Sequence, residues 1–398
     1  MDPQLCATFV RDDGKHPSSI PWLDMQKTPE DHGSVIRSVV MVRPEAGGVA
    51  YMAASCAQEM RARGINVTEL VGSEGGSPAY DGFRMVWAHR AQIRAADVVH
   101  VELGITAISA FWLAVWTSVL RGRLVTVVHD GPRIVNAPGS GLIRTGHGRR
   151  DAFAHKVFAP LLDRPLRAWI VSRTQEWVTP SHRSAAEMEA AELSPTTVVP
   201  LGAGPPLQSA SPSQCDTIIY AGFISPDKGL DILIDAWELI HEETTMRLRI
   251  IGGYSRQHAN YADRLRDRLA DCDRTSSWSG WVNDEDFSLA VAEAAIVVLP
   301  YRQSNPVSGV LIRAAVEGRA IVGSDVPAIT DFLLDGVSAE VLKRNTADQL
   351  ARTLLTLCSN PRVQDELGAE AARWAKEHCS WQGQVDQLLS VYRMCVRI

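Results

Sequence analysis

Two glycines and one lysine lie where a phosphorylated ligand could be bound, each between an apolar run and a helix-like stretch. Gly47 and Gly48 follow the run SVVMVRP. Without side chains, they let backbone N–H groups approach an anion at a helix N-terminus. A simple tight turn explains the pair equally well, because the full GxGxxG spacing is absent.

Lys228 lies in the segment AGFISPDKG, between the apolar run that begins at Thr217 and another helix-like stretch. Only six of the 40 basic residues are lysines, so its position is conspicuous. Its flexible ammonium could neutralise a diphosphate. The alternative is a solvated loop lysine that pairs weakly with Asp227.

The segment SNPVSGVLIRAAVEG follows the apolar run AIVVLPY and predicts a third phosphate-binding position. Backbone N–H groups of Ser308, Gly309 and Val310 would open a helix and point at an anion above the strand. Ser308 could instead be only an N-cap.

Histidines and acids end two further apolar runs. His129 and Asp130 end VTVVHD, and His100 and Glu102 alternate along VVHVEL, so that the latter two share one face of a strand. These residues are expected at the edge of the sheet, facing the cleft and an acceptor. A structural role for a histidine beside an apolar strand remains the alternative.

Common motifs of other chemistries are absent from the sequence. There is no GxxxxGK[ST], HExxH or GxSxG pattern. Asp271 and Asp273 form an Asp-x-Asp pair, but in a charged stretch that does not follow a strand. No metal site and no cofactor are therefore expected.

Short β-branched runs alternate with helical periods from Ser38 to Gly202, and again from Thr217 onward, which is typical of parallel sheets with crossover helices. Ala203 to Gln214 is rich in Pro, Ser and Gly and is the expected linker. The sequence predicts an α/β fold with two doubly wound Rossmann-like domains facing a central cleft. The expected boundaries are an extension over 1–36, domains over 37–204 and 215–380, and a last helix over 381–398.

The composition restricts the class of protein further. The 398 residues carry a net charge of −6, which argues against broad nucleic-acid binding. Seven scattered cysteines suit a reducing compartment. Met1 to Gly33 lacks the apolar core of a secretory signal. Ile105 to Leu120 is too short to span a membrane comfortably and is expected as a buried helix. A soluble, cytoplasmic protein is expected, with an unknown oligomeric state.

The order of these motifs resembles that of the retaining, metal-independent nucleotide-sugar glycosyltransferases of the GT-B type, in glycosyltransferase family 4. The resemblance runs from about Arg37 to the C-terminus. It rests on the glycine pair, the HD pair at a strand end, VTPS, VVPLG and AGFISPDKGLDILIDAW, followed by RIIGG, WSGWV, LPYR and SGVLIRAAVEGRAIVGSDV.

This resemblance implies roles for several residues. Lys228 would contact the donor diphosphate, the backbone of Ser308, Gly309 and Val310 would bind phosphate, and His129 would contact the transferred sugar. Trp281 and Val282 would lie near the nucleotide base. The last helix would cross back to the first domain.

Three positions depart from the family pattern. The arginine of the family is Phe223 here, and its two glutamates fall on Asn305 and Arg313. Asn305 could still bind a sugar hydroxyl. Arg313, one turn into the expected helix, could replace the missing cation at the diphosphate, or it could pair with Glu317 four residues later.

The resemblance predicts an enzyme, a hexosyltransferase. It would move a hexose, with retention, from a UDP- or GDP-linked sugar to a small-molecule, glycan or lipid-linked acceptor. A lipid-linked acceptor would bring the protein into peripheral contact with a membrane. A silent paralogue that binds a nucleotide sugar or glycan as a partner subunit is the main alternative. A sugar-nucleotide epimerase of similar fold is another.

Overall fold

The computed structural model describes residues 35–396, apart from residue 46 and residues 74–76, 105–106, 135–160, 162, 208–209, 255–257, 271, 273–274, 304–306 and 334–335. The described residues from Ile36 onward belong to one compact unit. This unit contains two six-stranded sheets, and every strand pair in both is parallel.

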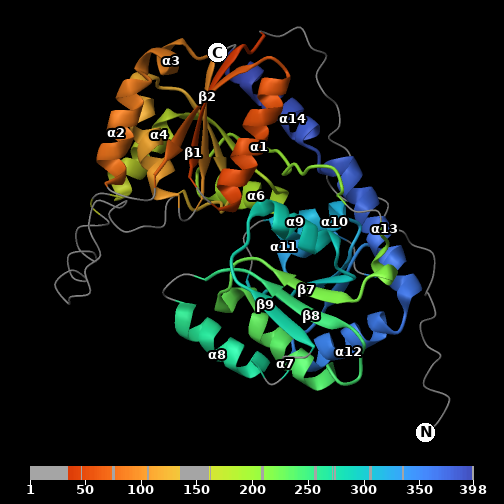
Figure 1. The fold of residues 1–398 in the computed structure, drawn as a ribbon. Helices are drawn as coiled ribbons and strands as arrows, with labels where there is room; N and C mark the ends of the chain where they lie inside the picture. Colours follow the sequence, from red (N-terminus) through yellow and green to blue (C-terminus); the bar gives the residue numbers. More distant parts are fainter. Residues whose placement is uncertain are drawn as a thin grey trace. The chain divides into compact units, whose positions relative to one another are not determined.

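The first sheet has the strand order β2-β1-β3-β4-β5-β6 (Figure 1). Its elements in chain order are β1 (Ser38–Pro44), α1 (Gly48–Ala62), β2 (Asn66–Gly72), α2 (Pro78–Ala88), α3 (Arg90–Ala95), β3 (Val98–Leu103), α4 (Ile108–Leu120), β4 (Leu124–Val128), β5 (Thr174–Thr179), α6 (His182–Ala190) and β6 (Thr196–Val198). Every residue of β3 and β4 is buried, as expected for strands of a parallel sheet that helices cover on both faces.

Helix α4 confirms the expected buried helix over its described part. Most of its residues are buried, and it packs against β1, β2 and β3. Within the described residues, no helix combines the length and apolar character needed to cross a membrane.

The second sheet has the strand order β12-β11-β10-β7-β8-β9. Its region comprises η4 (Pro212–Gln214), β7 (Thr217–Ala221), η5 (Pro226–Lys228), α7 (Leu230–Ile240), β8 (Arg247–Ile251), α8 (Ala259–Ala270), β9 (Ser276–Ser279), α9 (Asp284–Ala292), β10 (Ile296–Leu299), α10 (Gly309–Val316), β11 (Ala320–Ser324), α11 (Pro327–Thr330), β12 (Glu340–Leu342), α12 (Ala347–Cys358) and α13 (Pro361–His378). The two parallel sheets with crossover helices confirm the predicted doubly wound α/β fold.

Both sheets contain a point where successive strands are added on opposite sides. In the first sheet it lies between β1 and β3, and in the second between β10 and β7. In open parallel sheets, ligands bind beyond the carboxyl ends of the strands at such a switch point. Residues that follow β1, β3, β7 and β10 are therefore placed to form a site.

The Pro- and Ser-rich connection between the sheets is held by side chains of the second half. The Glu317 carboxylate accepts the N–H of Leu207 at 2.9 Å, and Arg319 donates to the carbonyl of Ala210 at 2.7 Å. Composition alone predicted a linker here, and these buried charged groups hold it at Leu207 and Ala210.

The last helix, α14 (Trp381–Val396), packs against α1 and β5 of the first sheet's region; Figure 1 shows it beside α1. Val385, Leu388 and Tyr392 join the hydrophobic cluster on that side of the sheet. Gln384 accepts the N–H of Gly202 at 2.8 Å, which ties the helix to the segment after β6.

Candidate functional site

Lys228 ends the short 3₁₀ turn η5, between the end of β7 and the start of α7. Gly229, with φ of 69°, makes the left-handed step into α7; a Cβ there would also collide with the carbonyl of Pro300. The Lys228 Nζ lies 4.3 Å from the centre of the Tyr301 ring. Burial lowers the pKa of Lys228, partly offset by the charges of Asp227 and Asp130.

Tyr301 connects the lysine to the start of α10. Its hydroxyl lies 3.0 Å from Oγ of Ser308, which in turn accepts the N–H of Leu311 as the N-cap of α10. Burial raises the pKa of Tyr301 to about 12, so it remains a neutral phenol. The structure therefore brings Lys228 and the N-terminus of α10 to the switch point between β7 and β10. Ser308 is a cap, and Gly309 and Val310 form the first turn.

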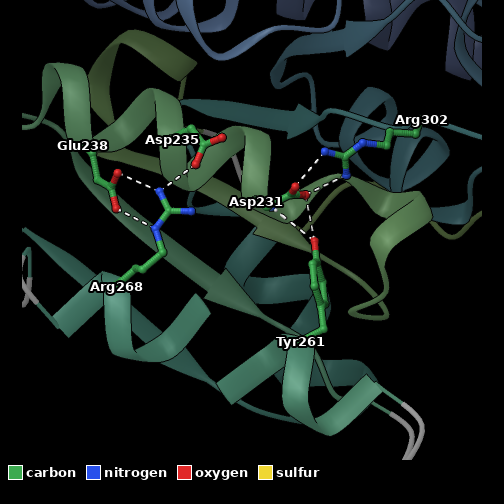
Figure 2. Close-up of polar contacts among 6 residues, drawn as sticks. All are labelled: Asp231, Asp235, Glu238, Tyr261, Arg268 and Arg302. Atoms are coloured by element: carbon green, nitrogen blue, oxygen red, sulfur yellow. Dashed lines mark hydrogen bonds and ion pairs between the residues drawn. The ribbon is translucent and has the colours of Figure 1, made fainter. Parts of the chain in front are cut away.

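Arg302 holds the lysine turn from the neighbouring strand end (Figure 2). Its guanidinium donates to both carboxylate oxygens of Asp231 and to the carbonyl of Pro226, at 2.6–2.8 Å. The Tyr261 hydroxyl donates to the same carboxylate at 2.8 Å. Burial raises the pKa of Asp231, but the bonds from Arg302 and Tyr261 outweigh it and leave that pKa lowered.

A second ion-pair group in Figure 2 fastens α8 to α7 farther along these helices. Arg268 contacts Asp235 and Glu238, each at 2.6 Å. These partly exposed pairs stabilise helix packing rather than the site.

The first sheet contributes a chain of polar side chains at β3 and β4. His129 Nε2 lies 2.5 Å from one carboxylate oxygen of Glu102, and His100 Nε2 lies 2.8 Å from the other. The Tyr392 hydroxyl, from α14, lies 2.7 Å from Nδ1 of His100. Sequence alternation placed His100 and Glu102 on one face correctly, but both are buried, so they support His129 rather than line an open surface.

The charges of this chain stabilise one another. Burial alone would raise the pKa of Glu102, but the neighbouring His129 and His100 lower it to about 2. Burial lowers the pKa of His129, but the charge and hydrogen bond of Glu102 outweigh it, leaving that pKa raised. A carboxylate paired with an imidazolium is the arrangement that this geometry favours.

Helix α1 begins at Gly48, and its N-cap Gly47 has φ of 91°, a conformation that glycine adopts without strain. A Cβ on either residue would meet no atom within 4 Å, so this backbone is open to an approaching ligand. A Cβ on Gly309 would lie 3.6 Å from the Met52 methyl, so the starts of α1 and α10 are neighbours. This contact, and the electrostatic effect of Asp130 on the pKa of Lys228, place site residues of the first sheet's region near those of the second.

Trp281 and Val282 follow β9, at the far side of the second sheet. Trp281 is largely exposed, and its ring lies against the backbone of Gly253. Phe223, which replaces the cation of the family pattern, is partly exposed and contacts His258 edge to face. These aromatic surfaces suit a stacked base better than a phosphate.

The structure supports the ion-pair alternative for Arg313 and not the predicted contact with a diphosphate. Its guanidinium lies 2.8 Å from the carboxylate of Glu317, toward the C-terminal end of α10. Glu317 is buried, and a buried carboxylate requires a cation; this outweighs the tendency of helical side chains to lean toward the N-terminus. The other departure, Asn305, lies outside the described residues.

Four residues around the site were not predicted to belong to it. Tyr301 and Arg302 end a strand run, and Asp231 follows Lys228 by three residues, so strand-end position and local spacing could have indicated them. Tyr392 gave no local signal, because its partner His100 is 292 positions away.

Comparisons with solved structures define the fold class. Anabaena HepE, solved in complex with UDP and glucose, superimposes with a TM-score of 0.67 at 14% identity, over 90% of this chain and 99% of that one. The described chain has the fold of the GT-B glycosyltransferases.

Sequence comparison finds similar proteins for the second half of the chain. The family model described as Glycosyl transferases group 1 matches residues 215–360. The phosphatidyl-myo-inositol mannosyltransferase of Mycolicibacterium smegmatis is 24% identical over 189 residues, 47% of each chain. The D-inositol 3-phosphate glycosyltransferase of Nocardiopsis dassonvillei is 26% identical over 197 residues, 46% of this chain and 44% of that one. The matched region thus spans about half the length of these curated relatives, and the similarity to group 1 glycosyl transferases covers residues 215–360.

Proposed function

We propose that this protein is a retaining glycosyltransferase of family 4 that transfers a hexose from a nucleoside-diphosphate sugar. The observation that carries the proposal is the placement of Lys228 and the N-terminus of α10 at one switch point, joined through Tyr301 and Ser308. A cation beside a helix N-terminus is suited to an anionic diphosphate.

The reaction would depend on the departing diphosphate. Breaking the glycosidic C–O bond leaves negative charge on the diphosphate oxygen, which Lys228 and the first amides of α10 would stabilise. His129 would donate a hydrogen bond to the transferred sugar. The acceptor hydroxyl would attack the same face, which gives retention, and its proton would pass to the leaving oxygen. These groups involve no metal ion, so transfer in EDTA should equal transfer without it.

An inositol-containing or lipid-linked acceptor is the class that we propose to test first. Two relatives act, by their names, on phosphatidyl-myo-inositol and on D-inositol 3-phosphate. Helix α2 exposes Tyr80, Phe83 and Trp87 by 60%, 43% and 52%, and Arg84 and Arg90 lie over two of these rings. Aromatic rings with arginines beside them suit the interface of an anionic membrane.

The donor is identified by thermal shift with UDP, GDP, UDP-glucose and GDP-mannose. A ligand at 100 times its dissociation constant should stabilise the protein by about 2.7 kcal/mol. The stabilising donor is then incubated with inositol phosphate or phosphatidylinositol, and NMR of the product gives the anomeric configuration. A product with the donor's configuration supports the proposal; an inverted product contradicts retention.

Binding without product would favour the silent paralogue, and an epimerised donor without acceptor would favour the epimerase.

Membrane contact is measured by co-sedimentation with phosphatidylglycerol vesicles and with phosphatidylcholine vesicles. The double variant Phe83→Ser/Trp87→Ser should lose at least threefold of the binding to the anionic vesicles. Leu239→Ser, which removes an exposed apolar side chain from α7, is the control. Equal binding by all three proteins would contradict a membrane-facing α2.

A further inference from the structure

The polar chain beneath His129 extends through the first sheet to the C-terminal helix. His129 and His100 each approach one oxygen of Glu102, and Tyr392 of α14 approaches the other ring nitrogen of His100. Apart from His129, whose side chain is 11% exposed, the members are buried. Buried polar groups are costly unless each is satisfied, so this chain specifies one arrangement.

Counting protons determines the direction of every bond. An ionised Glu102 only accepts, so both histidines donate to it through Nε2. Within the described residues the buried Tyr392 hydroxyl has this one partner, so it donates its proton to Nδ1 of His100, which accepts. Burial raises the pKa of Tyr392 well above its usual value, so its hydroxyl keeps the proton that it donates. The other ring nitrogen of His129, Nδ1, makes no hydrogen bond to the other members of this polar chain.

Other titratable groups near the chain do not change this accounting. Cys56, on α1, acts on Glu102 only as a neutral thiol, because burial raises its pKa well above its usual value. Asp130 adds a second negative charge beside His129, and Lys228 lies within the electrostatic reach of Asp130. Glu102 is therefore the one carboxylate that is hydrogen-bonded to His129 among these groups.

We propose that Glu102, His100 and Tyr392 are positioning residues that fix the His129 ring and supply the countercharge for its protonated form. His129 then presents Nδ1–H, as a cationic donor, to the sugar or diphosphate; this role rests on the proposed function. Because Tyr392 belongs to α14, docking of the last helix is part of forming the site.

The experiment follows histidine ring nitrogens by ¹⁵N NMR in the full-length protein, together with donor binding across pH 5–9. In the parent, His129 should be protonated at neutral pH, and His100 should be a single Nε2–H tautomer. Donor affinity should fall as the pH rises through the pKa of His129, since the cation is lost there.

Glu102→Gln should lower the pKa of His129 by at least one unit. The pH at which donor affinity is lost should therefore fall by at least one unit, a tenfold change in proton concentration. Tyr392→Phe keeps the packing of the ring but removes the donor to Nδ1, so the ¹⁵N signal of His100 Nδ1 should shift, while Glu102 still holds the Nε2–H tautomer. Thr126→Val is the matched control, because it removes a partly buried hydrogen bond between Thr126 of β4 and Thr174 and changes no member of the polar chain. Both histidine signals should be unchanged in it.

An unchanged His129 pKa in folded Glu102→Gln protein would overturn the proposal. If that variant does not fold, an unchanged ¹⁵N signal of His100 Nδ1 in Tyr392→Phe would overturn it instead. If the ring signals shift as expected but no nucleoside-diphosphate sugar binds the parent, the chain positions His129 and the proposed function fails. The two outcomes are thus distinguishable.

Discussion

The two halves of the site hold Lys228 and His129 in different ways. Lys228 is placed by a short turn and by neighbours at one strand end, and its supporting pair, Arg302 and Asp231, is partly exposed to solvent. His129 is placed by a buried carboxylate, a second histidine and a tyrosine from the last helix. The first arrangement is screened and adaptable, whereas the second is rigid and depends on distant contacts.

This difference suits the two tasks that we propose. A flexible ammonium can follow the charge of a diphosphate as its bond to the sugar breaks, because it needs no fixed direction. An imidazole that contacts one sugar hydroxyl must keep its ring plane and its proton in place. The lysine half should therefore be sensitive to loss of charge, and the histidine half to loss of its support.

The largest expected effect comes from Lys228→Ala. Removing the cation at the switch point should weaken binding of the nucleoside diphosphate about 30-fold, or about 2 kcal/mol, as for a hydrogen bond to a charged group. Isothermal titration calorimetry measures the dissociation constant of the nucleotide that thermal shift identifies. Lys376→Ala, in the last turn of α13, is the control and should bind as the parent does. Equal affinities of both variants would remove Lys228 from the site.

The next prediction concerns stability in acid. The pKa of Glu102 is lowered in the folded protein to about 2 from an ordinary value of 4.5. Its stabilisation is thus present above pH 4.5 and is lost as the pH falls toward 2. Between pH 6 and pH 3 the parent should lose on the order of 1–2 kcal/mol more of its free energy of unfolding than Glu102→Gln does. Urea titrations at both pH values measure this, and parallel losses would contradict a charged, paired Glu102.

Arg302→Gln should have a smaller effect. Its pair with Asp231 is partly exposed, so the free energy of unfolding should fall by less than about 1 kcal/mol. Donor affinity should fall by about threefold, because the turn that carries Lys228 loses its bond to the carbonyl of Pro226. A loss as large as that of Lys228→Ala would mean that Arg302 itself binds the donor.

Arg313→Ala should have the smallest effect on binding. Its guanidinium is paired with Glu317, so donor affinity should stay within about twofold of the parent. Stability should fall by about 1.5–3 kcal/mol, since the buried Glu317 carboxylate loses its bond to Arg313 but keeps the N–H of Leu207. A tenfold loss of donor affinity with an unchanged free energy of unfolding would restore the diphosphate role of Arg313.

Local patterns in the sequence predicted the strands and helices of this protein and its fold class. Alternating β-branched runs and helical periods predicted two parallel α/β regions, because burial on both faces demands apolar strands. Strand-end position also selected Gly47, Lys228, Ser308 and His129, since the carboxyl ends of parallel strands meet at one edge. Lys228 and Ser308 lie close to each other for this reason.

Only the tertiary structure decided what each side chain contacts. The sequence left the direction of Arg313 open, and the buried charge of Glu317 decided it, because an unpaired carboxylate in the interior is costly. It likewise gave no reason to join Tyr392 to His100, since a contact across 292 positions exists only when α14 packs against the first sheet's region. Local periodicity specifies elements and their ends, whereas hydrogen-bond partners and charge states follow from burial, which the whole packed chain creates.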